Sequence, residues 1–287
     1  FIYFNLILVF FSIFIFSKCL ILLKVRPLII SFTLLIIISS VDLLTWPRYI
    51  LTDMIFSFLI MLIIYVIIKS ISGLKLNYFL LTFLIFLIFL TRPTSIPYIF
   101  AILTFIFITK TNIKYSKNFI LISIFALIAF IPFLYSMVYF FMKVFLLEIP
   151  QSVFLIEMVE KGIIIHDRPE TWVKFSNSFL NVALLYFLRF IYFFNPYAES
   201  FSTIHILLNM LQTLLIFFSI CVLIFLKSEV KSFQKTTMLI IIISLSVAFF
   251  HSFTLIDFDW RYRVPIIMPM IMIIPISIES IFRKFKF

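Results

Sequence analysis

An aspartate stands at the mouth of an apolar run, at the end of the stretch Trp46-Pro47-Arg48-Tyr49-Ile50-Leu51-Thr52-Asp53. A carboxylate held there could act as an acid or a base, or as a ligand for a divalent cation. The structural alternative is that Asp53 complements the dipole of the helix that follows, while Trp46 and Tyr49 belong to an aromatic belt at a membrane surface. Asp53 is therefore a candidate catalytic residue and a candidate metal ligand.

An arginine separates two further apolar runs, in the short stretch Thr91-Arg92-Pro93-Thr94. An arginine at the centre of a membrane costs about 2.5 to 3.5 kcal/mol on insertion scales, and less toward the interface. Arg92 therefore either extends to the headgroup region or pairs with an anionic group. A prenyl phosphate is one such group.

Charged and aromatic residues alternate in Asp257-Phe258-Asp259-Trp260-Arg261-Tyr262-Arg263, directly before another apolar run. In an extended segment this period of two places the charged side chains on one edge and the aromatic ones on the other. One edge could hold a phosphate and the other a sugar face or a lipid. The structural alternative is that the charges pair with each other and the aromatic residues lie in the membrane belt.

The composition shows what kind of chain must position these residues. Of the 287 residues 64% are hydrophobic and 12% are charged, and the mean hydropathy is +1.26, which excludes an ordinary water-soluble domain. Two glycines, Gly73 and Gly162, are too few for a nucleotide-binding loop. Cys19 and Cys221 lie far apart in apolar stretches and do not indicate a disulfide framework or a thiolate metal site.

Ten apolar runs are candidates to cross a membrane. They lie at about 1–17, 28–41, 54–68, 76–90, 95–109, 119–142, 179–194, 203–226, 238–256 and 264–282. Cytoplasmic loops retain basic residues, so the position of the charges orients the chain, and the net charge of +11 does not indicate nucleic acid binding. The basic clusters are Lys18, Lys24 and Arg26; Lys69 and Lys75; Lys110, Lys114 and Lys117; Lys227, Lys231 and Lys235; and Arg283, Lys284 and Lys286.

All these clusters face the cytoplasm only if the run at 179–194 does not cross. That run contains Asn181 and Arg189 and ends at Asn195-Pro196, which favours an interfacial or re-entrant helix on the outer side. We therefore predict an all-α polytopic membrane protein of about nine transmembrane helices, forming one domain over 1–287. The amino end would lie outside and the carboxyl end in the cytoplasm.

The predicted outer side differs from the inner side in its basic residues. Six of the eight arginines are outside, namely Arg48, Arg92, Arg168, Arg189, Arg261 and Arg263. The planar guanidinium suits phosphate and carboxylate recognition, whereas lysine suffices for topology. A long extracytoplasmic region at 143–202 is large enough to form a lid. His166, His205 and His251 have no partner at metal-ligand spacing and are interpreted as structural.

Taken together, three motifs resemble those of a known family. They are Trp46 to Asp53 entering a span, Arg92-Pro93-Thr94 closing the next hairpin, and Arg261-Tyr262-Arg263-Val264-Pro265 before the last span. In their order and sidedness they resemble the membrane-embedded glycosyltransferases of the GT-C type. The nearest branch is the bacterial relatives of the dolichyl-phosphate-mannose protein mannosyltransferases and of the lipid A aminoarabinose transferases.

The resemblance implies a hexosyl or pentosyl transferase in a bacterial inner membrane, acting on the extracytoplasmic side. The donor would be a polyprenyl-phosphate sugar and the acceptor a glycan, a lipid or a protein. Such enzymes carry an acidic pair in an outer loop after their first span. The resemblance therefore places the main catalytic base upstream of Phe1 and implies that the chain is truncated at its amino end.

The resemblance also suggests roles for individual residues. Asp53 matches the family's second outer acidic position, which is linked to a divalent cation such as Mg²⁺ or Mn²⁺ or to the acceptor. The donor phosphate would be held by Arg261 and Arg263, and also by Arg92 and Arg48. The candidate contacts to the sugar or the lipid are Tyr262, Trp260 and Tyr49.

Two other classes of protein fit parts of the pattern. A polysaccharide polymerase or ligase would share the many spans, the outer arginines and the long outer loop. A lipid-linked oligosaccharide flippase or another transporter would be expected to carry ionisable residues near mid-membrane, and the apolar runs are almost free of them. A shared site on the outer side requires Asp53, Arg92 and Arg261 to lie at the same end of the bundle.

Overall fold

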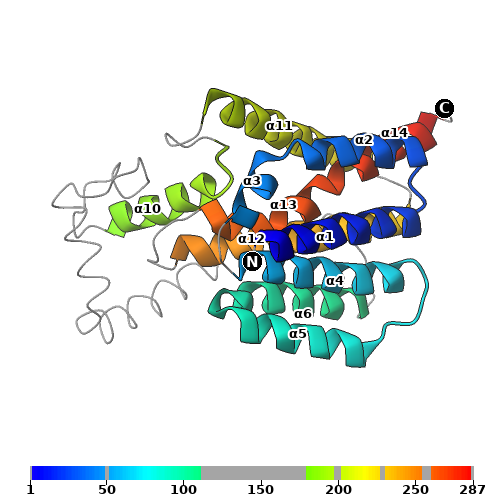
Figure 1. Cartoon of the computed structure of the whole chain (residues 1–287), viewed down its shortest axis with the longest axis horizontal. Coiled ribbons are helices and arrows are strands. Elements are labelled where there is room, and N and C mark those ends of the chain that lie inside the picture. Colours follow the sequence, from blue (N-terminus) through cyan, green and yellow to red (C-terminus); the bar gives the residue numbers. More distant parts are fainter. Residues whose placement is uncertain are drawn as a thin grey trace.

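The chain folds into a bundle of helices (Figure 1). The computed structural model describes residues 2–48, 52–110, 179–196, 202–226, 230–253 and 260–285. Within these ranges every regular element is helical and none is a strand. The predicted all-α class is therefore confirmed for the described residues.

Five of the described helices are long and apolar enough to cross a membrane. They are α1 (Ile2–Leu22), α4 (Asp53–Ile71), α11 (Thr203–Leu226), α12 (Lys231–Phe253) and the pair α13 (Val264–Ile271) and α14 (Ile273–Phe285), which together form one apolar stretch. Three apolar helices are shorter: α2 (Pro27–Ile38), α5 (Tyr78–Thr91) and α6 (Ile96–Lys110). These lengths and compositions are compatible with an integral membrane protein.

Local signals fix where several of these helices begin and end. Pro27 occupies the first turn of α2, where its missing N–H costs nothing. The Asn77 side chain caps α5 by accepting a hydrogen bond of 3.0 Å from the Leu80 amide. Gly73 follows the end of α4 with a φ of +98°, a conformation that glycine adopts without steric cost.

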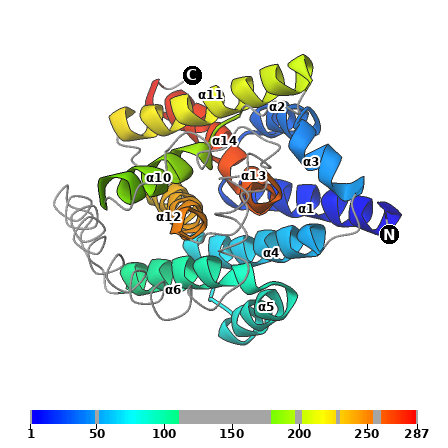
Figure 2. The same ribbon diagram turned by 90° about the vertical axis from the view of Figure 1, so that its left-hand side faces the viewer.

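The helices pack side by side (Figures 1 and 2). Helix α4 packs between α1 and α5 and also contacts α13, α6 packs on α12, and α14 packs on α11 and α2. The stretch formed by α13 and α14 is the most deeply buried of the five candidate spans, and α11 is the least buried. Large apolar side chains such as Phe79 on α5 and Phe225 on α11 face outward, as expected for helices surrounded by lipid.

The central helix is interrupted. The run at 264–282 was predicted as one span, but α13 ends at Ile271, Met272 forms a turn, and α14 begins at Ile273. Pro269 lies inside α13, and Pro275 lies in the first turn of α14. Proline has no N–H to donate and its ring displaces the preceding turn, which accounts for the break.

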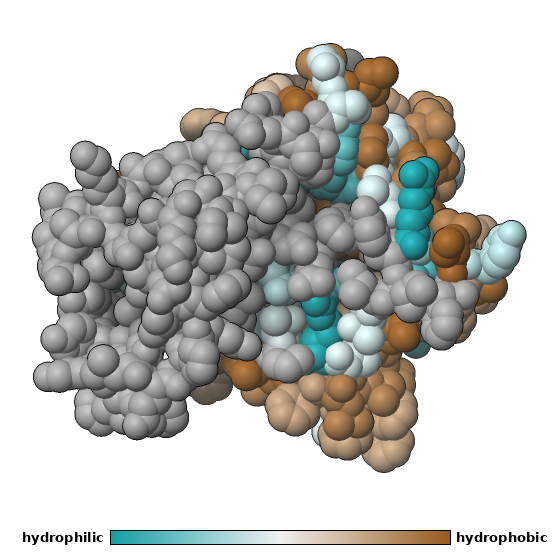
Figure 3. Space-filling model, turned by 60° about the vertical axis from the view of Figure 1, so that its left-hand side comes forward, coloured by the Kyte–Doolittle hydropathy of each residue, from teal (hydrophilic) through white to brown (hydrophobic). Residues whose placement is uncertain are grey.

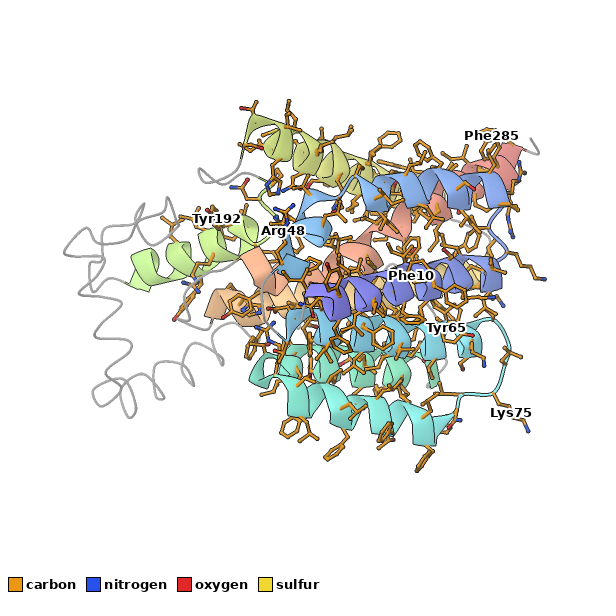
Figure 4. The ribbon with its side chains drawn as sticks, in the orientation of Figure 1. Phe10, Arg48, Tyr65, Lys75, Tyr192 and Phe285 are labelled. Atoms are coloured by element: carbon orange, nitrogen blue, oxygen red, sulfur yellow. The ribbon has the colours of Figure 1, made fainter. Side chains whose placement is uncertain are left out.

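The two ends of the bundle differ. We call the end on the left of Figure 1 the loop end. It carries four short elements, namely α3 (Val41–Thr45) and the 3₁₀ turns η1 (Trp46–Arg48), η2 (Pro93–Ser95) and η4 (Trp260–Arg263). The opposite end, which we call the lysine end, carries the turn between α1 and α2, the turn between α4 and α5, and the end of α14. Figure 4 labels Arg48 toward the loop end and Lys75 at the lysine end.

A buried carboxylate ties the lysine end together. Glu279 of α14 is 2% exposed and accepts hydrogen bonds of 2.8 Å from Nε of Arg283 and 3.1 Å from the backbone N–H of Arg26. Arg283 also donates a bond of 2.6 Å to the Lys24 carbonyl. These contacts hold the turn between α1 and α2 against the last helix.

Candidate functional site

Asp53 and Arg92 meet at the loop end. Asp53 lies in the first turn of α4, where a carboxylate complements the helix dipole. Arg92 follows α5 in an extended conformation, as the residue before a proline usually does. The two side chains form an ion pair in which the Asp53 carboxylate is nearly fully buried and the arginine is largely covered. The anionic partner of Arg92 in the folded chain is therefore a protein carboxylate.

The ring of Tyr262 covers this ion pair from a third segment. Its centre lies 5.7 Å from the guanidinium carbon of Arg92, within the range of a cation–π contact. The ring also stacks on the imidazole of His251 at 4.4 Å with an interplanar angle of 26°, and His251 stacks in turn on Phe193 at 5.8 Å. Tyr262 is thus held between an arginine and a histidine.

The stack extends to the helix that was predicted to be interfacial or re-entrant. That segment forms α10 (Phe179–Tyr192), which packs on α12. Its Arg189 is 2% exposed and donates a hydrogen bond of 3.1 Å to the His251 carbonyl. Tyr192, near the end of α10, is labelled toward the loop end in Figure 4. Arg189, on which the prediction of an interfacial or re-entrant helix partly rests, is therefore buried within the protein and bonded to α12.

A second buried carboxylate, Asp42 in α3, gathers three donors. His205 Nε2 lies 2.7 Å and Asn209 Nδ2 lies 3.3 Å from Oδ1, and Arg263 Nη2 donates to Oδ2 at 2.9 Å. An ionised carboxylate only accepts, so the imidazole carries a proton on Nε2. Arg263 donates a further bond of 2.6 Å to the Asn195 carbonyl. Asp42 therefore connects α3, α11, η4 and the end of α10.

The surroundings of Asp42 favour its charged form. Burial raises the pKa of this carboxyl, but the charge of Arg263 and the hydrogen bonds from His205, Arg263 and Asn209 together place it below its ordinary value. A depressed pKa in the folded state stabilises the fold above the unfolded pKa of about 3.9, and this contribution is lost as the pH falls through the folded value.

We therefore expect acid to destabilise the protein partly through Asp42. Between pH 6 and pH 3 the wild type should lose more free energy of unfolding than Asp42→Asn, which has no carboxylate to protonate. Chemical unfolding in detergent, followed by circular dichroism at a series of pH values, measures both curves. Parallel curves for the two proteins would show that Asp42 does not titrate differently in the folded and unfolded states.

The structure brings together four of the predicted site residues and separates or leaves out the others. Asp53, Arg92, Tyr262 and Arg263 all lie at the loop end. Arg48 is in η1 with an exposed side chain. Tyr49 lies outside the described residues. Trp260 and Arg261 are in η4, but their side chains lie outside the part that the structure describes.

One expectation about the last loop is wrong. The alternation at 257–263 was interpreted as an extended segment with all charges on one edge, but residues 260–263 form a 3₁₀ turn. With about three residues per turn, neighbouring side chains point in different directions. Tyr262 and Arg263 accordingly contact different partners. Residues 257–259 lie outside the described residues.

Sequence reasoning missed Asp42 and assigned no chemistry to His205. The two residues are separated by 163 positions, and no spacing rule pairs residues at that distance. One signal was present, because both are polar residues at the ends of apolar runs on the predicted outer side. The same geometry bears on the proposed metal site: within the described ranges no three His, Cys, Asp or Glu side chains come together as metal ligands, and Asp53 faces a guanidinium.

The polar side chains of this end are set among apolar surfaces. Figure 3 shows hydrophilic residues in the middle of the visible face, with hydrophobic surface above and below them.

Comparison of the chain with models of protein families gives no match. Searches against curated proteins and against solved structures give no match either. The function must therefore be inferred from the chemistry of the loop end.

Proposed function

We propose that this chain is the body of a GT-C type membrane glycosyltransferase that uses a polyprenyl-phosphate sugar as donor. The observation that carries the proposal is that Arg92 contacts both Asp53 and Tyr262. They come from three separate loops that the sequence predicts on the outer side. The motifs that resemble the family are the ones that supply these three residues.

The arrangement of the helices supports an outer location of this site. The five long and three short apolar helices correspond to eight of the nine predicted spans, and the ninth, at 119–142, lies outside the described residues. With nine spans the lysine end faces the cytoplasm, as basic residues favour. The loop end then faces the extracytoplasmic side of a bacterial inner membrane.

The ion pair suggests how the donor would bind. Phosphate and carboxylate present similar oxygen geometry to a guanidinium, and a guanidinium has five N–H donors, so a donor phosphate would bind to Arg92 beside the Asp53 carboxylate. The Tyr262 ring would face the sugar or the first part of the lipid chain. Arg263 bonds to Asp42 and to the Asn195 carbonyl, whereas Arg92 lies against the Tyr262 ring, and we therefore assign the phosphate to Arg92.

Asp53 would then be a carboxylate beside the donor. In the proposed reaction an acceptor hydroxyl or amine attacks the anomeric carbon in line with the bond to phosphate. The new bond to the acceptor forms, the bond between the anomeric carbon and the phosphate oxygen breaks, and polyprenyl phosphate leaves. The acceptor proton passes to the Asp53 carboxylate, while Arg92 stabilises the departing phosphate.

Binding of a polyprenyl monophosphate tests the proposal directly. The chain in lipid nanodiscs should bind polyprenyl monophosphate more tightly than the neutral polyprenol, measured by native mass spectrometry or microscale thermophoresis. Hydrogen bonds to charged groups contribute about 1.5 to 3 kcal/mol, so Arg92→Gln should weaken phosphate binding by about 10- to 100-fold and leave polyprenol binding unchanged.

Arg26→Gln is a matched control, because Arg26 pairs with the buried Glu279 at the lysine end. It should bind like the wild type. Equal affinity of the wild type for the phosphate and the alcohol would refute the proposal. Radiolabelled polyprenyl-phosphate mannose or aminoarabinose separates the reaction classes: a transferase releases polyprenyl phosphate, whereas a transporter moves the donor without cleaving it.

A further inference from the structure

Two carboxylate–arginine pairs lie at the loop end, and one short turn touches both. Tyr262 of η4 contacts the guanidinium of Arg92, which pairs with Asp53. The next residue, Arg263, pairs with Asp42. The two pairs are therefore connected through the backbone of consecutive residues.

The Asp42 pair is the more firmly held of the two. Asp42 is 4% exposed and Arg263 is 8% exposed. The carboxylate also receives donors from two positions one turn apart on α11, His205 and Asn209. A buried carboxylate with three donors, two of them on one helix, has little freedom to reorient. Arg263 is therefore fixed relative to α11 and α3.

The Arg92 pair is held differently. The contacts of Arg92 include the carboxylate of Asp53 and the face of Tyr262, and the second of these depends on where η4 lies. Tyr262 is itself located by His251 on one side and by its neighbour Arg263 along the chain. Releasing Arg263 would let η4 shift, and the ring would no longer limit the positions of the Arg92 guanidinium.

We propose that Asp42 is a positioning residue for the phosphate site. By holding Arg263, with His205 and Asn209 as supports, it keeps Tyr262 against Arg92 and so preorganises the guanidinium for the donor phosphate. This inference rests on the proposed function. In this role Asp42, His205 and Arg263 keep η4 in position, and none of the three contacts the donor directly.

The experiment is a double-mutant cycle on the affinity for polyprenyl monophosphate in nanodiscs. Asp42→Asn and Arg263→Gln should each weaken binding about 10-fold. Because both act through the same contact, the double variant should bind no more weakly than Arg263→Gln alone. Affinity for neutral polyprenol should fall by less than affinity for the phosphate in all three, since recognition of the charge depends on Arg92.

Two further variants separate positioning from loss of fold. Glu279→Gln removes an equally buried, arginine-paired carboxylate at the lysine end, so it should lower the unfolding midpoint as Asp42→Asn does while keeping wild-type affinity. Tyr262→Phe keeps the ring and should lose much less affinity than Tyr262→Ala. A loss that followed the unfolding midpoint in all variants would overturn the inference.

The remaining outcomes distinguish the inference from the function on which it rests. If the wild type prefers polyprenyl monophosphate and Asp42→Asn binds as tightly, Asp42 is not a positioning residue and the proposed function stands. Additive losses in the double variant would also overturn the role, because Asp42 would then act by a route other than Arg263. If the wild type does not prefer the phosphate over the alcohol, both the proposed function and this inference fail.

Discussion

Replacing Arg92 by alanine is expected to lower the free energy of unfolding by about 3 to 5 kcal/mol, because it leaves a buried carboxylate without its cation. Asp53 is 2% exposed, so water cannot readily replace the lost partner. The measurement is unfolding of the purified chain in mixed micelles, followed by circular dichroism as the fraction of denaturing detergent rises.

The partner variants make this prediction specific to the pair. The double variant Arg92→Ala with Asp53→Asn should be more stable than Arg92→Ala alone, since no uncompensated charge remains. Arg26→Ala, at the lysine end, should cost about 1 kcal/mol or less, because the Arg26 side chain is 42% exposed and its contact with Glu279 is 3.8 Å long. Strictly additive losses in the double variant would show that Asp53 and Arg92 are not energetically coupled.

Truncation of Phe56 should have a comparable effect through packing. Phe56 of α4 and Tyr98 of α6 are each 1% exposed, and their rings meet edge to face at 5.0 Å and 83°. Phe56→Ala should therefore cost about 3 to 5 kcal/mol. Both residues lie within one turn of the starts of α4 and α6, so the same variant should weaken binding of polyprenyl monophosphate. The unfolding assay used for Arg92→Ala also measures the loss of free energy of unfolding in Phe56→Ala.

Tyr98→Phe is the matched control for this prediction. The Tyr98 hydroxyl is buried and has no hydrogen-bond partner among the residues that the structure describes. Removing an unpaired buried hydroxyl while keeping the ring should be neutral or slightly stabilising. A loss above about 1 kcal/mol in Tyr98→Phe would indicate that the hydroxyl is bonded, and the cost of Phe56→Ala could then not be ascribed to ring packing alone.

Much of the helical architecture follows from hydropathy. The run at 95–109 corresponds to α6 (Ile96–Lys110), and the run at 203–226 corresponds to α11 (Thr203–Leu226). These elements are predictable because long apolar stretches with few glycines have one way to satisfy their backbone in lipid. The break at Met272 was not predicted, although Pro269 and Pro275 mark it, because the apolar character continues through both prolines.

The site was predictable only in part. Asp53, Arg92 and Arg263 were selected as charged residues at the edges of apolar runs, and Tyr262 was selected as an aromatic residue between two arginines. Their partners were not, because ion pairing between loops depends on how helices pack and not on local spacing. Asp42 illustrates this, since its donors lie 163, 167 and 221 positions away. The roles suggested for these side chains in catalysis and phosphate binding stay predictions.

The interruption of the central helix at Met272 separates two sets of packing contacts. Helix α13 packs on α4, which begins at Asp53, whereas α14 packs on α11 and α2 and carries Glu279. A continuous helix of 22 residues would transmit a shift of its first turn to its last, but a joint lacking proline N–H donors absorbs it. A substitution at the lysine end, such as Glu279→Gln, should therefore leave the contacts of Asp53 at the opposite end unchanged.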